Sequence, residues 1–167
     1  GKSTTAAAFY TDGYPLLDDD IVVIDTEGAQ PTVGPGVPQL KLTPEMSDRF
    51  DIDSDGVAAG HDGTEKTHYR TETDGIDHSG VPLGSVYVLE GGATVSVEPV
   101  SGHDALFELI ANTYTGGILD ETDRTAHNFT QCTRVISAAS VNTLSRPADL
   151  TALPDMIDAA VDHVTHA

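Results

Sequence analysis

The chain has 167 residues and a formal net charge of -19, with 27 Asp and Glu against 8 Lys and Arg. Such an acidic surface repels nucleic-acid backbones and anionic membranes, and no apolar run reaches the ~18 residues of a membrane span, so neither partner is expected. Apolar residues make up 38% of the chain and recur in periodic blocks, which argues against disorder. We therefore expect a single domain over residues 1–167 with a core of its own.

The lysine-poor, aspartate-rich composition resembles that of cytoplasmic proteins from salt-loving archaea. In such cells carboxylates keep proteins hydrated in molar salt, which screens charges beyond about 3 Å. The chain is therefore interpreted as halophilic and cytoplasmic, and the alternative is an acidic interaction module from an ordinary cell. The single cysteine, Cys132, excludes an internal disulfide and is expected to be a small core residue.

The N-terminal part of the chain predicts helices separated by a strand and a loop. A helix is expected over residues 2–11, ended by Asp12 and Gly13. Apolar residues at 16–17 and 21–24 predict a strand that three aspartates interrupt. A Gly- and Pro-rich loop with one short strand is expected over 28–38. A short helix over 44–50 follows, with Thr43 as its N-cap and Pro44 in its first position.

Residues 51–80 are polar and glycine-rich, and predict an exposed excursion with one or two short strands. The spacing of Asp51, Asp53, Asp55, Gly56 and Asp62 imitates a calcium-binding EF-hand loop, but the residues that follow predict a poor exiting helix. The three histidines of the excursion, at 61, 68 and 78, are too irregularly spaced to favour a zinc site.

The remainder predicts strands alternating with helices. Two apolar runs around Gly91 and Gly92 predict a β-hairpin, and Ser101 with Asp104 predicts a helix that opens with a capping box. The other expected elements are a helix over 121–139, a strand over 141–146 and an amphipathic helix over 153–166. This alternation predicts an α/β fold with a mixed sheet flanked by helices.

The opening Gly-Lys-Ser-Thr matches the second half of the phosphate-binding P-loop, G-x-x-x-x-G-K-[ST]. In such a loop the lysine reaches the β- and γ-phosphates, a hydroxyl holds Mg²⁺, and the start of the following helix favours anions. Lys2, Ser3 and Thr4 stand at the start of the predicted helix, as this chemistry requires. The tetrapeptide alone is also compatible with an ordinary exposed helix start.

The stretch LLDDDIVVID places three adjacent aspartates between apolar flanks. Adjacent like charges are costly unless a cation or a substrate balances them. A phosphotransferase with a P-loop needs a carboxylate nearby, to hold Mg²⁺ or to accept the proton of the attacking hydroxyl. The alternative is an acidic surface cluster, and the apolar flanks favour the functional interpretation.

Together, GKST, a helix, Gly13-Tyr14, Leu16-Leu17 and Asp19-Asp20 resemble the C-terminal domain of HPr kinase/phosphorylase and the HPr serine kinase-like proteins. These proteins share a P-loop fold with the phosphoenolpyruvate carboxykinases. The segments LKLTP, VPLGSVYVLE and VNTLSRPADL extend the resemblance over nearly the whole chain. It implies a P-loop-containing mixed sheet flanked by helices, without the first strand and the first half of the P-loop.

The resemblance implies a phosphate site at the start of the chain, for ATP or GTP with Mg²⁺. Gly1 and Lys2 would bind the nucleotide, with the lysine on the β- and γ-phosphates. Ser3 would ligate Mg²⁺, and Thr4 would touch the α-phosphate.

The resemblance also implies roles for the aspartate pair. Asp19 or Asp20 would be the general base and the other would lie near Mg²⁺. Both carboxylates should then lie roughly 4–7 Å from the Ser3 hydroxyl, the span of a bridging metal and a water. Lys66 or Arg146 would clamp the transferring phosphate.

The implied function is a kinase-like phosphotransferase. Its partners would be a nucleotide and a hydroxyl-bearing acceptor on a protein, peptide or small molecule, and the oligomeric state is left open. One departure matters: the Arg- and Gly-rich stretch that carries a Mg²⁺-binding glutamate in true HPr kinases has no counterpart here. The alternative is therefore a non-catalytic nucleotide-binding module with a regulatory or peptide-modification role.

Overall fold

The computed structural model describes residues 1–52, 66–71, 80–114 and 124–166. Contacts divide the chain into two compact units. Unit 1 comprises Gly1–Val23 and Gly34–Val81, and unit 2 comprises Ile24–Val33 and Pro82–Ala167. Both units combine helices with strands, so the predicted α/β class is confirmed. Two compact units can belong to one domain, so the expected single domain over residues 1–167 stays a prediction.

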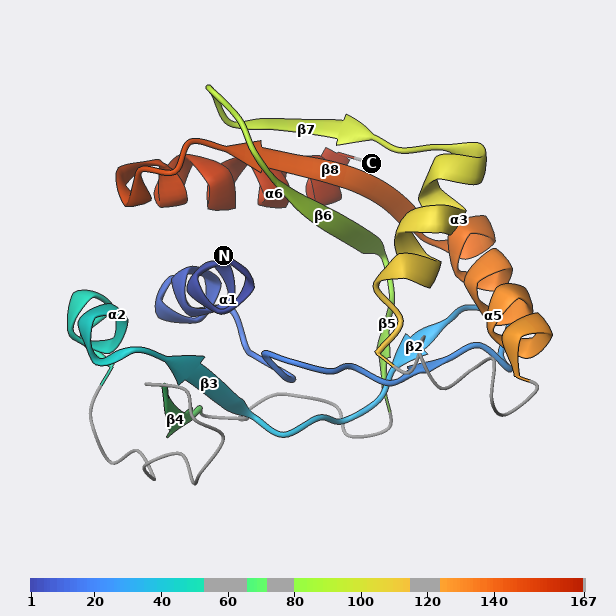
Figure 1. Cartoon of the computed structure of the whole chain (residues 1–167), viewed down its shortest axis with the longest axis horizontal. Coiled ribbons are helices and arrows are strands. Elements are labelled where there is room, and N and C mark those ends of the chain that lie inside the picture. The colour runs from blue at the N-terminus through green and yellow to red at the C-terminus, as the bar shows by residue number, and fades with distance from the viewer. Residues whose placement is uncertain (53–65, 72–79, 115–123, 167) are drawn as a thin grey trace. The chain divides into compact units, whose positions relative to one another are not determined.

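Unit 1 is built on a helix packed against a two-stranded sheet (Figure 1). Its elements are α1 (Lys2–Thr11), β3 (Gln39–Leu42), α2 (Pro44–Arg49) and β4 (Thr67–Arg70). The predicted first helix is confirmed to the residue, and it ends where Gly13 adopts a φ of +96°, a conformation that favours glycine. β3 and β4 pair antiparallel, with Leu40 opposite Tyr69.

The core of unit 1 lies between α1 and this sheet, and its buried members are Ala7, Leu40, Leu42 and Tyr69. The hydroxyl of Tyr69 donates to the Ser47 hydroxyl on α2 over 2.9 Å, so the buried phenol has a polar partner. α2 was predicted one residue longer. Thr43 is its N-cap as expected, but the Thr43 side chain makes no capping hydrogen bond.

The strand predicted over residues 16–24 is wrong except at its end, where β1 (Ile24–Asp25) begins. Oδ1 of Asp18 accepts hydrogen bonds from the backbone N–H groups of Asp20, over 2.8 Å, and Ile21, over 3.2 Å. This local bonding turns the chain where a strand would have to continue. Val22 and Val23 are consequently 48% and 68% exposed. Their apolar, β-branched character was a misleading strand signal.

Most of the expected excursion at 51–80 cannot be compared with the structure. β4 is a short strand within it, as predicted. Positions 53, 55, 56 and 62 of the EF-hand-like spacing, and the histidines at 61 and 78, lie outside the described residues. In the preceding loop, β2 (Thr32–Val33) is the short strand that was expected.

Unit 2 is centred on a three-stranded mixed sheet with the order β6-β8-β7 (Figure 1). Its strands are β6 (Ser85–Gly91), β7 (Ser96–Pro99) and β8 (Ser140–Arg146). β6 runs parallel to β8, and β7 runs antiparallel to it. A smaller sheet has the order β1-β2-β5, in which β5 (Val81–Pro82) stands at the boundary between the units.

The hairpin predicted between β6 and β7 is therefore wrong, because β8 lies between these strands (Figure 1). β8 contains the buried side chains Val141, Asn142 and Leu144, and its place at the centre of the sheet gives it a neighbour on each side. The link from β6 to β7 passes the end of β8, where the Gly92 N–H donates to the Arg146 carbonyl over 2.9 Å. A Cβ on Gly92 would lie 3.1 Å from that of Ser145, so this close passage favours glycine.

The helices of unit 2 match their predicted positions more closely than the strand pairing did. They are α3 (Gly102–Ala111), α5 (Thr125–Ala138), the 3-10 turn η1 (Leu150–Ala152) and α6 (Leu153–His166). α6 packs its buried face against β7 and β8, with Met156 fully buried. Ser101 is the N-cap of α3, but its side chain makes no capping bond, so the predicted capping box is not formed. Cys132 is a buried free thiol in α5, as expected.

Within the described ranges, no helix is both long enough and apolar enough to cross a membrane.

Candidate phosphate and metal site

The start of α1 carries the residues expected to bind phosphate. Gly1 is the N-cap, and the first backbone bond of the helix runs from the Thr5 N–H to the Gly1 carbonyl over 3.0 Å. The N–H groups of Lys2, Ser3 and Thr4 precede that bond, so they are helix-start donors that no turn of the helix can satisfy. The helix dipole adds partial positive charge at this end, which favours an anion.

A turn formed by Asp18, Asp19 and Asp20, here called the acidic turn, belongs to the same unit. Asp18 shapes this turn with both carboxylate oxygens. Oδ1 accepts the Asp20 N–H within the turn, and Oδ2 accepts the Val37 N–H over 2.9 Å. Gly36 packs so closely that an added Cβ would lie 2.6 Å from the Asp18 Cβ. Asp18 is thus a structural residue that orients the two aspartates after it.

Asp19 is a half-buried carboxylate between β3 and α1. Its Oδ2 accepts the Lys41 N–H over 2.9 Å, whereas its Oδ1 is buried without a hydrogen-bond partner among the described residues. Burial raises the pKa of Asp19 above its ordinary 3.8, and the Lys41 amide, the Ser3 hydroxyl and the charge of Lys66 oppose that rise. The Ser3 hydroxyl thus lies near this carboxylate, but too loosely to form a hydrogen bond that satisfies Oδ1.

Asp20 lies on the exposed side of the acidic turn. Its Oδ2 is 2.6 Å from Nζ of Lys41, and the two side chains are 54% and 28% exposed respectively. The hydrogen bond from Lys41 is the main cause that lowers the pKa of Asp20, and the charges of Lys41, Lys2 and Lys66 act in the same direction. Asp19 and Asp20 are therefore neighbours in sequence whose pKa values move in opposite directions.

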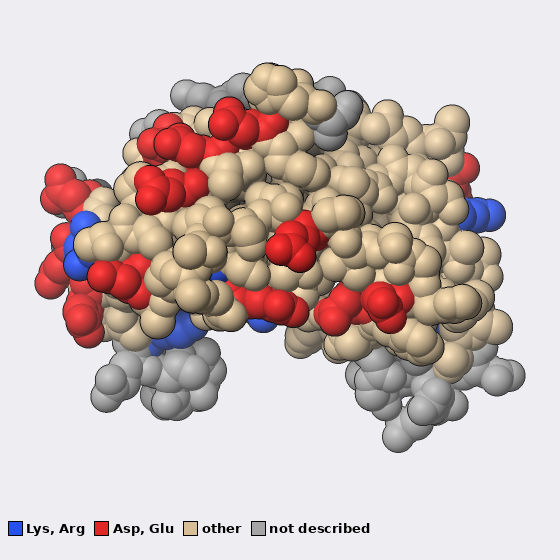
Figure 2. Space-filling model, turned by 90° about the horizontal axis from the view of Figure 1, so that it is seen from above, with Lys and Arg blue, Asp and Glu red and all other residues tan. Residues whose placement is uncertain are grey.

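The lysines of this chain converge on the aspartate pair. The sequence contains only Lys2, Lys41 and Lys66 as lysines, and the charges of all three act on Asp20. Figure 2 shows one face of the molecule, on which acidic side chains are widespread and basic ones are few. A gathering of all three lysines in a chain with a net charge of -19 offsets the local negative charge, which makes the approach of a phosphate less unfavourable there than elsewhere on the surface.

The structure brings some of the predicted site residues together and not others. The Ser3 hydroxyl lies near Asp19, Lys66 acts on both aspartates, and Lys2 acts on Asp20. Asp20 forms an ion pair with Lys41, and its predicted distance of roughly 4–7 Å from the Ser3 hydroxyl stays a prediction. Arg146 belongs to unit 2, where its guanidinium donates to the Pro147 carbonyl over 2.8 Å, and its role in binding phosphate stays a prediction.

Lys41 and Asp18 were missed as members of this site. The scarcity of lysine was the available signal for Lys41, because in such a chain each lysine is a candidate ligand for an anion. Nothing in the sequence distinguishes Asp18 from the aspartates beside it. Its structural role depends on the approach of the loop at Gly36 and Val37.

The oxygen ligands of Ser3 and Asp19 suit Mg²⁺, which waters and phosphates help to coordinate, better than they suit a metal whose ligands are all protein side chains. Among the described residues, no three His, Cys, Asp or Glu side chains gather into a metal site. Mg²⁺ is commonly held by one or two carboxylates, with waters and substrate phosphates completing its shell. The Asp19 carboxylate lies near the Ser3 hydroxyl and has a buried oxygen, Oδ1, without a hydrogen-bond partner among the described residues, so it is a suitable first ligand for such an ion.

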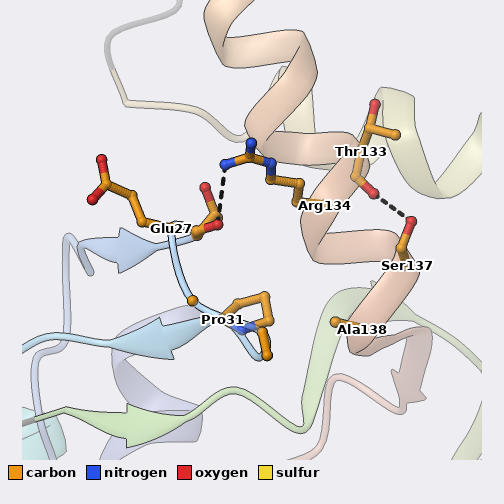
Figure 3. A pocket seen from close by; sticks show the side chains of 9 residues that line it. Glu27, Pro31, Thr133, Arg134, Ser137 and Ala138 are labelled. Atoms are coloured by element: carbon orange, nitrogen blue, oxygen red, sulfur yellow. Dashed lines mark hydrogen bonds between the residues drawn. The ribbon is translucent and has the colours of Figure 1, made fainter.

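Unit 2 contains a separate pocket of about 420 Å³ between α5 and the loop that follows β1. Arg134 reaches from the helix to the loop and donates to the Thr26 carbonyl over 3.2 Å (Figure 3). On the helix, the Ser137 hydroxyl donates to the Thr133 carbonyl over 2.8 Å. None of the predicted site residues lines this pocket.

Comparison with known proteins gives no match: no family model, curated protein or solved structure is significantly similar to this chain.

Proposed function

We propose that this chain carries the phosphate-binding and catalytic end of a nucleotide-dependent phosphotransferase of the HPr kinase-like group, on a P-loop fold. It would use ATP or GTP with Mg²⁺ to phosphorylate a hydroxyl group on an acceptor. The observation that supports this best is that Ser3, at the start of α1, lies near the carboxylate of Asp19, one oxygen of which is buried without a hydrogen-bond partner among the described residues. The convergence of the lysines on the same place adds the charge that a triphosphate needs.

In this proposal the start of α1 binds the phosphates. Lys2 contacts the β- and γ-phosphates, and the amides at the helix start bind their oxygens. Ser3 and Asp19 would hold Mg²⁺, which would neutralise negative charge on the phosphates. Lys66 remains a candidate contact to the transferred group, because its charge reaches both aspartates.

Asp20 is the better placed of the two aspartates to act as general base, because its side chain is 54% exposed, whereas Asp19 is half-buried. It would take the proton of the acceptor hydroxyl as the acceptor oxygen bonds to the γ-phosphorus. The bond from that phosphorus to the oxygen it shares with the β-phosphate breaks, and the nucleoside diphosphate leaves with the electron pair.

A second candidate, a non-catalytic nucleotide-binding module, is favoured by one observation. The carboxylate of Asp20 is paired with Lys41 at 2.6 Å, and its lowered pKa makes it a weak proton acceptor. In that case nucleotide would bind at the same residues without transfer of a phosphate.

The two candidates are separated by measuring binding and turnover in molar KCl, with MgATP and MgGTP and a panel of hydroxyl-bearing acceptors. Lys2→Ala should weaken nucleotide binding by about tenfold or more, since a charge-assisted contact contributes roughly 1.5–3 kcal/mol. Asp20→Asn should lower kcat by about 100-fold, the usual contribution of a general base.

Arg49→Met is the matched control, because it removes an exposed cation in unit 1 that does not act on either aspartate. Nucleotide affinity that is equal in the wild type and Lys2→Ala would contradict both candidates. Tight nucleotide binding without turnover for any acceptor would contradict the phosphotransferase and support the non-catalytic nucleotide-binding module.

A further inference from the structure

Lys41 is bonded to both aspartates of the proposed site, through two different groups. Its backbone N–H donates to Oδ2 of Asp19 over 2.9 Å, and its ammonium lies 2.6 Å from Oδ2 of Asp20. No other described residue makes hydrogen bonds to the side chains of both aspartates.

The strand geometry explains how one residue reaches both carboxylates. β3 pairs with β4, and Lys41 lies opposite His68 in that pairing. The Lys41 amide is used by Asp19, so it points to the side of β3 away from β4, where no further strand is paired among the described residues. Asp19 thus satisfies an amide at an open sheet edge, which otherwise needs a partner.

This arrangement separates the two carboxylates. The amide of Lys41 fixes Oδ2 of Asp19 and leaves Oδ1 without a hydrogen-bond partner among the described residues, and the Ser3 hydroxyl lies near the same carboxylate. The ammonium draws Asp20 to the exposed side of the turn. Without the ammonium, the Asp20 carboxylate loses the ion pair that it makes within the described residues and is free to turn, while the hydrogen bond from the Lys41 amide to Asp19 remains.

We propose that Lys41 is the positioning residue of this site, which holds Asp19 toward the metal and Asp20 toward the acceptor. This inference rests on the proposed phosphotransferase function. Lys41 acts through the aspartates, so it contributes to the chemical step more than to the binding of nucleotide.

The kinetic test compares Lys41→Met, which keeps the amide and most of the side-chain length, with Lys41→Arg, which keeps the charge. Lys41→Met should lower kcat by at least about tenfold, because misplacing a reacting group by about 1 Å can cost 100-fold. The KM for nucleotide should change by less than about threefold, and Lys41→Arg should recover most of kcat. Arg49→Met controls for the loss of one positive charge. A kcat for Lys41→Met equal to that control, or a loss confined to KM, would overturn the inference.

A second measurement does not depend on activity. In NMR spectra of the isotope-labelled chain without nucleotide, Asp19→Asn should shift the Lys41 amide resonance much more than Asp20→Asn does. The resonances at the end of the Lys41 side chain should respond in the opposite order. If the wild type binds and turns over no nucleotide, the proposed function fails, and these resonances alone decide whether Lys41 holds the pair. Resonances of Lys41 that respond to neither substitution would reject the inference, even in an active enzyme.

Discussion

Each of the two compact units is stabilised by a different kind of interaction. In unit 2, the seven-residue strands β6 and β8 pair along their whole length, and α6 packs apolar side chains against the sheet. In unit 1, the site depends on a turn whose carboxylates accept backbone N–H groups from Asp20, Ile21, Val37 and Lys41. Unit 2 is therefore sensitive mainly to lost apolar volume, and the acidic turn mainly to crowding and to charge.

This difference shows that part of the acidity of the chain is structural. Asp18 and Asp19 each accept hydrogen bonds from the backbone, so they are not interchangeable with exposed acidic residues that make no such bond. Counting acidic residues describes the surface of such a protein, but the hydrogen bonds decide which carboxylates the fold requires.

The largest effect is expected in the apolar core of unit 2. Leu144, on the central strand, is 2% exposed, so Leu144→Ala should lower the free energy of unfolding by about 2–5 kcal/mol. Urea denaturation in molar KCl, followed by circular dichroism, measures this loss. Val164→Ala is the control, because Val164 is 54% exposed on α6 and the substitution should cost less than about 0.5 kcal/mol. An equal loss of unfolding free energy in the two variants would contradict the conclusion that unit 2 is stabilised mainly by apolar packing.

A smaller loss is expected from crowding of the acidic turn. The Cβ of Gly36→Ala would lie 2.7 Å from the Leu17 carbonyl oxygen as well as against Asp18, so the loop or the turn must move. We expect a cost of about 1–3 kcal/mol in the same denaturation assay, as for other overpacked sites. Gly84→Ala is the matched control, because nothing lies within 4 Å of its added Cβ. A tolerated Gly36→Ala would show that the turn is held less tightly than its contacts indicate.

The smallest effect concerns how the free energy of unfolding changes as the pH is lowered. The ion pair with Lys41 lowers the pKa of Asp20 in the folded protein. The ion pair therefore adds to the free energy of unfolding at pH values above the ordinary pKa of 3.8, and this stabilisation is lost as the pH falls through the lower folded pKa. Burial raises the pKa of Asp19, so ionisation of Asp19 opposes folding, and that cost disappears as the pH falls through its higher folded pKa to below 3.8. Each contribution should stay below about 1 kcal/mol, as for exposed or half-exposed charges.

The measurement is the free energy of unfolding between pH 6 and pH 3, roughly a unit or two around the ordinary carboxyl pKa. Asp20→Asn should be less stable than the wild type at the upper end and converge with it at the lower end. Asp19→Asn should lack the slight gain that the wild type shows as the pH begins to fall. A single trend shared by both variants would mean that the two carboxylates are not in different environments.

Local patterns in the sequence predicted the helices and the last strand well. α6 follows from apolar periodicity, α1 from its run of alanines and the Asp12-Gly13 end, and β8 from its short run of strand-forming residues, all of which are properties of neighbouring positions. The pairing of β6 was not predictable in this way. Its partner is β8 and not the next strand along the chain, and alternating apolar residues indicate a strand without identifying its partner.

The site was predictable to the extent that it depends on residue type. The GKST motif and the aspartate pair led to Ser3 and Asp19, which do lie together. The same reasoning placed the aspartates on a buried strand, because Ile21, Val22 and Val23 are strand formers. It could not anticipate that Asp18 would bond to the amides that follow it. The part played by Lys41 depends on which edge of β3 faces the turn, which is a property of the folded chain.

The position of β8 between β6 and β7 also constrains the order in which unit 2 can form. Ser85 and Ser140, which face each other at the start of the parallel pair, are 55 residues apart in sequence. β6 and β7 emerge from the ribosome before β8, the strand that joins them, so each must wait with an unpaired edge until β8 has been synthesised after α5. Contacts between such distant segments slow folding, because a long loop must close before any of them stabilises the chain. We therefore expect slow, late closure of this sheet, with the acidic turn of unit 1 able to form earlier from residues close in sequence.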